Sequence, residues 1–158
     1  MMSASILIYA GAFLSVLTVV VFFHELGHFS IARLCGVRVE TFSIGFGREL
    51  FGWNDSKGTR WKVCLLPLGG YVKFWGDESA ASTPDDEALQ KMTPAEKAVS
   101  FHHKPLPQKM AVVMAGPLAN FVLALLILTA LYSALGRTVT VPRVDAVQPG
   151  SAAEQAGF

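Results

Sequence analysis

Two long stretches of apolar, uncharged residues stand out in the pattern along the chain. The first runs from Ala4 to Phe23 and the second from Met110 to Gly136. A helix rises about 1.5 Å per residue, so about 20 residues cross a hydrocarbon core about 30 Å thick. We therefore predict two transmembrane helices, at residues 4–34 and 110–136. A cleaved signal peptide would need a basic residue before its apolar core. No Lys or Arg precedes the first stretch, so we expect this helix to be retained.

The segment between the predicted helices, residues 35–109, has a β-like composition in its first half. The runs VRVETFSIGFG (37–47) and TRWKVCLLPLGGYVKFWG (59–76) are rich in β-branched and aromatic residues. Pro67–Gly70 supplies turn residues between two strand-like runs, which predicts a β-hairpin with its turn at this point. The hairpin carries more apolar side chains than a solvated hairpin needs, so we expect it to contact the membrane or the functional site.

The last segment, residues 137–158, contains short β-prone runs, a Pro149–Gly150 turn and a helix-prone piece at residues 151–156. A strand, turn and helix of about 20 residues cannot bury a core by themselves. We therefore expect this segment to open a further domain, and the chain to be the amino-terminal part of a longer protein. The predicted fold class is a membrane protein that is mainly α-helical.

Composition and charge support this fold class. Hydrophobic residues make up 52% of the chain, charged residues only 16%, and the mean hydropathy is +0.43, which is too apolar for a typical soluble domain. The net charge is +1, and we expect no nucleic-acid partner. Eleven of the thirteen Lys and Arg residues lie from Arg33 to Lys109. The positive-inside rule therefore places this loop in the cytoplasm and both ends of the chain outside.

The candidate chemistry lies in VVVFFHELGHFSIARLCG (19–36), at the end of the first predicted helix. Ionisable side chains at membrane depth are costly and mark a functional site by default. His24 and His28 are four residues apart, so both imidazoles lie on one face of a helix and can bind one Zn²⁺. Glu25 can then act as the general base that deprotonates a water at the metal. Gly27 is expected to leave room for a substrate backbone.

Peptide hydrolysis within a membrane needs an extended substrate, because a helix shields its own backbone. A strand of the predicted hairpin can hold an extended segment by strand addition, so we predict substrate contacts at Gly69, Gly70 and Tyr71. Asn120 is the one strongly polar side chain in the second predicted helix. It is a further candidate for substrate binding, although an interhelical hydrogen bond explains it equally well.

Other interpretations are open at this point. His24 and His28 could be core residues satisfied by backbone carbonyls, beside a salt-bridged Glu25. A proton transporter would need polar groups on several spans, and the second span offers only Asn120. A soluble zinc protease is excluded by the two membrane-length stretches. The paired histidines at 102–103 lie in a basic juxtamembrane segment and are expected near lipid headgroups.

The chain resembles the amino-terminal part of the site-2-protease-type intramembrane zinc metalloproteases, and most closely their bacterial RseP (regulator of sigma-E protease) branch. The resemblance rests on FFHELGHFSIAR, FSIGFG, PLGGYVKFWGD, MAGPLANF and VDAVQPGSAAEQAGF. It implies that His24 and His28 bind zinc and that Glu25 is the catalytic base. It also implies that PLGGYV forms a membrane-associated β-structure near the substrate path, and that residues 137–158 begin a PDZ-like domain.

The resemblance further implies a multi-pass protein of the bacterial inner membrane, with the HExxH motif near the cytoplasmic face and the PDZ-like segment outside. Its partners would be the lipid bilayer and single-span substrates, such as anti-sigma factors or signal-peptide remnants, cut in regulated intramembrane proteolysis. In this family an Asp from a later span, in a motif ending Leu-Asp-Gly, completes the zinc site. No such motif occurs here, and catalytic zinc normally has three protein ligands. Activity is therefore expected of the complete protein; the alternative is an inactive scaffold with a PDZ-type peptide-binding module.

Overall fold

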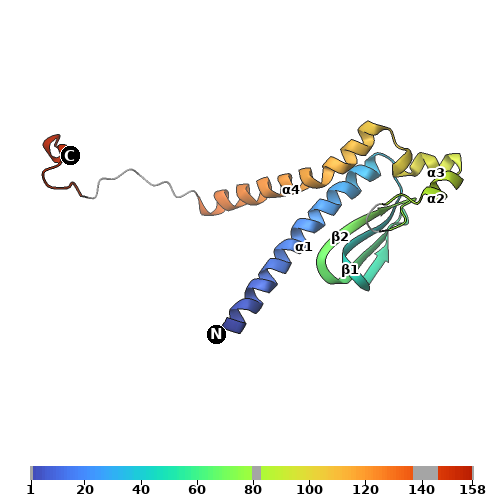
Figure 1. The fold of residues 1–158 in the computed structure, drawn as a ribbon, viewed down its shortest axis with the longest axis horizontal. Helices are drawn as coiled ribbons and strands as arrows, with labels where there is room; N and C mark the ends of the chain where they lie inside the picture. The colour runs from blue at the N-terminus through green and yellow to red at the C-terminus, as the bar shows by residue number, and fades with distance from the viewer. Residues whose placement is uncertain (1, 80–82, 137–145, 158) are drawn as a thin grey trace. The chain divides into compact units, whose positions relative to one another are not determined.

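The computed structural model describes residues 2–79, 83–136 and 146–157 (Figure 1). The chain divides into a first unit that extends to Leu125 and a second unit that begins at Leu126. The elements in chain order are α1 (Met2–Leu34), β1 (Val39–Asn54), β2 (Arg60–Phe74), α2 (Asp86–Lys91), α3 (Pro94–Val99), the short 3₁₀ helix η1 (Phe101–His103), α4 (Leu106–Leu135) and α5 (Ala152–Gln155).

Helices α1 and α4 contain the two segments, among the described residues, that are long and apolar enough to cross a membrane. Ser5–Leu34 has a mean hydropathy of 2.6 and Leu106–Leu135 one of 2.4. Large apolar side chains on both helices are exposed, among them Phe13 and Phe121, and such surfaces need apolar surroundings. The two helices therefore fit the predicted membrane protein. Helix α4 continues through Pro117, so this proline lies inside the helix.

Strands β1 and β2 pair antiparallel and form a β-hairpin, as predicted for this segment, but with other strands than those predicted. The prediction that Pro67–Gly70 forms the connecting turn is wrong, because β2 runs through these residues. The turn lies at Asp55, whose carboxylate accepts hydrogen bonds from the backbone N–H groups of Lys57 and Thr59, both at 2.9 Å. Gly58 in the same turn has a φ of +83°, a conformation that glycine adopts without strain.

The two strands are bent, which brings different parts of β2 against one part of β1. The register shifts repeatedly, and Ile44 faces both Val63 and Gly70. Gly45 and Gly47 follow Ile44 with φ angles of +85° and +82°, which favour glycine. Pro67, which has no N–H to donate to a strand ladder, lies between the two partners of Ile44. Pro67–Gly70 thus lie where β2 bends, between the two segments of β2 that pair with Ile44.

The core of the first unit forms where the second half of α1 packs against the hairpin. Phe42 of β1 is fully buried. Its ring centroid lies 5.9 Å from that of Phe22, 5.5 Å from Phe29 and 4.3 Å from Trp61. Val112 of α4 belongs to the same cluster. Because Phe22 and Phe29 flank the HExxH motif along α1, this core holds the turns of helix that carry the motif.

An ion pair ties the end of α1 to the hairpin turn. Arg33, in the last turn of α1, pairs with the carboxylate of Asp55. Burial by itself would raise the pKa of Asp55. The hydrogen bonds from Thr59, Lys57 and Trp61, together with the Arg33 guanidinium, outweigh it and hold the pKa below its ordinary value. The charged form of Asp55 is therefore the form that the fold stabilises.

A second polar contact joins the end of the hairpin to the segment before α4. The side chain of Asp77 is fully buried, and one of its oxygens lies 2.7 Å from Nε2 of His102. The other oxygen accepts a hydrogen bond from the backbone N–H of Phe74 at 2.9 Å. His102 therefore contacts Asp77, and His103 is the exposed member of the pair. The position of these residues near lipid headgroups stays a prediction.

The predicted PDZ-like segment is described in part, because residues 137–145 and 158 lie outside the described residues. A turn at Pro149–Gly150 precedes α5, which begins after Ser151. The Ser151 hydroxyl caps the helix by accepting from the backbone N–H of Glu154. These elements match the predicted turn and short helix, and the PDZ-like character of the segment stays a prediction.

Candidate metal centre

Helix α1 brings the two predicted zinc ligands together. His24 and His28 lie one turn apart on one face, with their ring centroids 4.8 Å apart and their Nε2 atoms 3.2 Å apart. Two imidazole nitrogens bound to one tetrahedral zinc, each about 2.0–2.1 Å from the metal, stand about 3.3 Å apart. The observed separation of the Nε2 atoms fits this geometry.

Glu25 lies where α1 meets β2. A Cβ atom at Gly70 would lie 3.3 Å from Cγ of Glu25, so the carboxylate is positioned beside the hairpin. Within the described parts of the chain, no Lys, Arg or His forms an ion pair with Glu25. The alternative in which His24 and His28 are ordinary core residues beside a salt-bridged Glu25 therefore lacks its salt bridge among the described residues.

One face of helix α4 packs against the histidine pair through three residues spaced by four: Val112, Gly116 and Asn120. Nδ1 of His28 donates to the backbone carbonyl of Val112 at 2.7 Å. Nδ2 of Asn120 lies 3.2 Å from Nδ1 of His24. Gly116, midway between them in the row, lies beside the rings. The Nδ1 atoms of both rings therefore contact α4, and the Nε2 atoms face each other, as shared binding of one metal requires.

Gly116 keeps the space beside the two Nε2 atoms open. A Cβ atom at this position would lie 2.8 Å from Nε2 of His24 and closer still to Nε2 of His28. Gly27, which was predicted to leave this room, faces α4 instead, because a Cβ atom there would overlap the backbone carbonyl of Ala115. The prediction for Gly27 is wrong because α4 packs directly against this glycine and fills the space beside it.

The residues present fit a metal ion held by two imidazoles, in the separation of the nitrogens and in the space that Gly116 leaves. Within residues 2–79, 83–136 and 146–157, no group of three or more His, Cys, Asp and Glu side chains is arranged to hold a metal ion. The described part of the chain therefore supplies two candidate ligands, His24 and His28. A catalytic zinc site normally has three.

The three hairpin residues predicted to bind substrate fall into two environments. Gly70 lies beside Glu25, as described above. Tyr71 stacks on Phe46 with ring centroids 6.0 Å apart, and a Cβ atom at Gly69 would meet the same Phe46 ring. The structure thus brings Gly70 to the HExxH motif and gathers Gly69 and Tyr71 around Phe46. The substrate-binding role of these residues and of Asn120 stays a prediction.

Sequence reasoning missed three residues of this region: Val112, Gly116 and Phe46. A signal for the first two was present, because Val112, Gly116 and Asn120 repeat on α4 the spacing of four that the two histidines have on α1. Phe46 lies in the FSIGFG run, but its place beside Gly69 and Tyr71 depends on the bend of β1 and could not be predicted from that run.

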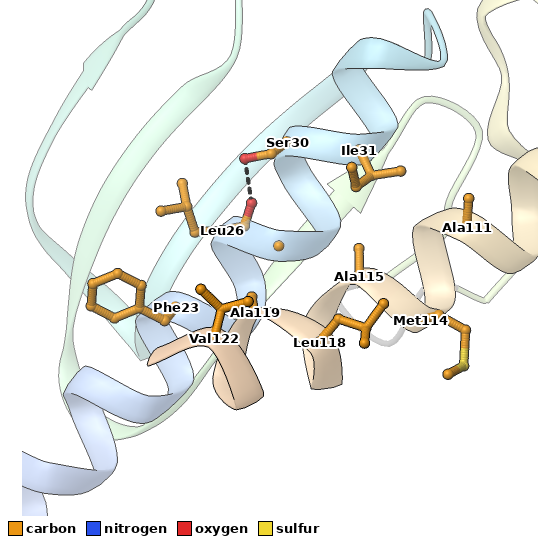
Figure 2. A pocket seen from close by; sticks show the side chains of 11 residues that line it. Phe23, Leu26, Ser30, Ile31, Ala111, Met114, Ala115, Leu118, Ala119 and Val122 are labelled. Atoms are coloured by element: carbon orange, nitrogen blue, oxygen red, sulfur yellow. Dashed lines mark hydrogen bonds between the residues drawn. The ribbon is translucent and has the colours of Figure 1, made fainter. Parts of the chain in front are cut away.

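An apolar groove of about 500 Å³ lies between α1 and α4 (Figure 2). Ile31 of α1 and Met114 and Leu118 of α4 are among the side chains that line it. The Ser30 hydroxyl, the one polar side-chain group in the lining, donates to the carbonyl of Leu26 at 2.6 Å. The groove is therefore a lipid-like surface without chemistry of its own. Leu26 and Gly27 of the HExxH motif line it, but His24, Glu25 and His28 do not.

An HExxH motif with facing imidazoles, and with a glutamate that forms no ion pair among the described residues, on a helix of membrane length, is the arrangement of a zinc peptidase built into a membrane protein. Comparison with known proteins agrees. The model of Peptidase family M50 matches residues 12–155. The chain belongs to this family. The resemblance to site-2-protease-type enzymes is thereby confirmed at the level of the family, and the RseP branch stays a prediction.

The relatives carry names of the same kind. The chain is 54% identical over 145 residues to a protein of Rhizobium meliloti (strain 1021) named "Putative zinc metalloprotease", an alignment that covers 92% of this chain and 39% of that protein. It is 46% identical over 160 residues to Metalloprotease MmpA of Caulobacter vibrioides, covering 96% of this chain and 40% of that protein. The chain thus spans about two fifths of the length of these relatives.

Proposed function

We propose that the complete protein is an intramembrane zinc metalloprotease in which His24 and His28 bind the zinc and Glu25 moves the protons of peptide hydrolysis. The observation that carries the proposal is the 3.2 Å separation of the two Nε2 atoms beside Gly116, on a helix long and apolar enough to cross a membrane. Membership of family M50 and the names of the relatives support it.

The residues of the chain have distinct tasks in this reaction. Zinc supplies a Lewis acid that polarises a peptide carbonyl and acidifies water. The Nδ1–H of His28 donates to Val112, which leaves the Nε2 lone pair for the metal. Glu25 accepts a proton from the attacking water and delivers it to the amine nitrogen as the C–N bond breaks. No Lys, Arg or His of the described residues pairs with Glu25, so its carboxylate is available to accept that proton.

The proposed substrates are membrane segments of single-span regulatory proteins, such as anti-sigma factors, and signal-peptide remnants, cut in regulated intramembrane proteolysis. A peptide bond must leave its helix before water can attack it. Gly70 lies beside Glu25, so an extended substrate held along this part of β2 would lie next to the carboxylate. We propose that Gly69–Tyr71 holds the extended segment by backbone hydrogen bonds.

We also propose that the protein is a multi-pass protein of the bacterial inner membrane, with residues 35–109 in the cytoplasm and the PDZ-like segment outside. The distribution of Lys and Arg supports this topology. Cysteine labelling tests it, in a background that lacks Cys35 and Cys64. An impermeant maleimide should label Ser151→Cys in intact cells and leave Ser79→Cys unlabelled. Labelling of Ser79→Cys from outside intact cells would contradict the proposed topology.

The decisive experiment for the protease is Glu25→Gln in the complete protein. The amide keeps the shape of the side chain but cannot act as a base, and general-base catalysis contributes about 10²–10⁴-fold in rate. Zinc content and membrane insertion should survive, while cleavage of a co-expressed single-span substrate falls below detection. Glu87→Gln, on exposed α2, is the matched control and should cleave normally. Cleavage at the parental rate by Glu25→Gln would show that the cut does not depend on Glu25, and the proposed catalytic role would fail.

A further inference from the structure

A continuous row of hydrogen bonds runs through both imidazole rings. Nδ2 of Asn120 lies 3.2 Å from Nδ1 of His24, Nε2 of His24 lies 3.2 Å from Nε2 of His28, and Nδ1 of His28 lies 2.7 Å from the carbonyl of Val112. A neutral imidazole has one donor nitrogen and one acceptor nitrogen. Because Val112 can only accept, the proton of His28 is on Nδ1. The proton of His24 is then on Nε2, between the rings, and the Asn120 amide donates to Nδ1.

Binding one metal through both Nε2 atoms requires a different arrangement at His24. His28 already offers a lone pair at Nε2, but His24 must give up the proton on Nε2 and carry one on Nδ1 instead. The net protonation of the ring does not change. The new Nδ1–H would then face the N–H of Asn120, and two donors cannot form a hydrogen bond.

The oxygen of the same amide resolves this conflict. Oδ1 of Asn120 is buried and has no hydrogen-bond partner among the described residues. A half-turn of the amide about the Cβ–Cγ bond exchanges Oδ1 and Nδ2 without changing the shape of the side chain. We infer that Asn120 is a positioning residue whose amide turns over to accept the Nδ1–H of His24 when the histidine pair takes up zinc. This inference rests on the proposed function.

The inference explains why an amide is suited to this position. Aspartate can accept the Nδ1–H of His24 but cannot donate to Nδ1, and leucine can do neither. Outer-shell acceptors of this kind fix the tautomer of a metal-binding histidine, and their loss typically costs about 10–100-fold in metal affinity. Replacing Asn120 by Asp should therefore fix His24 in the metal-binding tautomer, and replacing it by Leu should leave the tautomer without support.

The test measures zinc affinity of the complete protein by competition with a chromophoric chelator. Asn120→Leu should bind zinc about 10–100-fold more weakly, and Asn120→Asp should bind it at least as tightly as the parent. Gln108→Leu is the matched control, because Gln108 is also on α4 and its buried Oε1 also has no partner; its affinity should equal that of the parent. Equal losses for the Asp and Leu variants, or an unchanged Leu variant, would overturn the inference.

A spectroscopic readout tests the tautomer directly. In the parent, the ¹⁵N shift of His24 Nδ1 should change from that of an acceptor nitrogen to that of a protonated nitrogen when zinc is added. A protonated Nδ1 before zinc is added would contradict the amide turnover. If the parent itself bound no zinc, the proposed function would fail as well; if it bound zinc and Asn120→Leu matched it, only the role of Asn120 would fail.

Discussion

Gly116→Ala should separate zinc binding from folding. The added methyl group would lie 2.8 Å from Nε2 of His24 and closer still to Nε2 of His28. Non-bonded carbon and nitrogen atoms settle at about 3.5 Å or more, so the rings must retreat by at least about 0.7 Å. Metal–ligand distances tolerate about 0.2 Å. The displacement therefore exceeds the tolerance of the site about threefold.

The expected loss of zinc affinity is at least about 100-fold, the upper end of what disturbing an outer-shell partner costs. The helix itself should not weaken, because Ala is a better helix former than Gly by about 0.8–1.0 kcal/mol in a helix interior. The Gly116→Ala protein should therefore keep its helix content and its thermal stability in detergent while it loses zinc.

The assay is zinc content and chelator competition on the complete protein, with circular dichroism on the same samples. Gly11→Ala is the matched control, because Gly11 lies within the other apolar helix and nothing lies within 4 Å of its added Cβ. It should bind zinc like the parent. Parental zinc affinity in Gly116→Ala would refute the placement of α4 against the histidine pair.

Two further predictions concern polar contacts outside the metal site. His102→Phe leaves the buried Asp77 carboxylate without its side-chain partner and should lower the free energy of unfolding by about 1–3 kcal/mol; His103→Phe, at the exposed neighbour, should not, and equal melting temperatures would argue against the contact. The pKa of Asp55 is lower in the folded than in the unfolded protein, so its stabilising contribution is present above about pH 4 and is lost as pH falls through the folded value. Asp55→Asn should flatten the pH dependence of the melting temperature in this acidic range, and an unchanged profile would deny a role for the Arg33 pair.

The two apolar helices could be predicted because a bilayer imposes both a length and a composition on any helix that crosses it. The pairing of His24 and His28 could be predicted for a different reason. Both ligands lie on the same helix, so the helical repeat alone sets their relation. Features of this kind depend on one segment of the chain and need no knowledge of the fold.

The hairpin was predictable but its turn was not. Both Asp55–Gly58 and Pro67–Gly70 contain residues that form turns, and a local reading of the sequence has no means to rank them. The structure decides between them through long-range contacts. Arg33, at the end of α1, pairs with Asp55 in the observed turn. Pro67–Gly70 stay within β2, where the strand bends between Val63 and Gly70, the two partners of Ile44.

The surroundings of the histidines could not be derived from the sequence, because they come from a helix far along the chain. Val112 is 84 residues from His28, and Asn120 is 96 residues from His24. When both helices are apolar all round, the pattern of apolar residues does not show which face of α4 meets the motif. It also does not set the distance between the two helices.

Gly27 permits the close approach of the two helices, and this links their packing to the candidate metal site. A Cβ atom at Gly27 would overlap the carbonyl of Ala115 and lie 2.8 Å from Cβ of Ala119, so α1 and α4 are in contact through their backbones at this point. Small residues permit such close approach between membrane helices. At a wider spacing, the carbonyl of Val112 and the amide of Asn120 would no longer reach the Nδ1 atoms of the histidines. Gly27 therefore serves the metal site indirectly, because it lets α4 come close enough to orient both imidazoles.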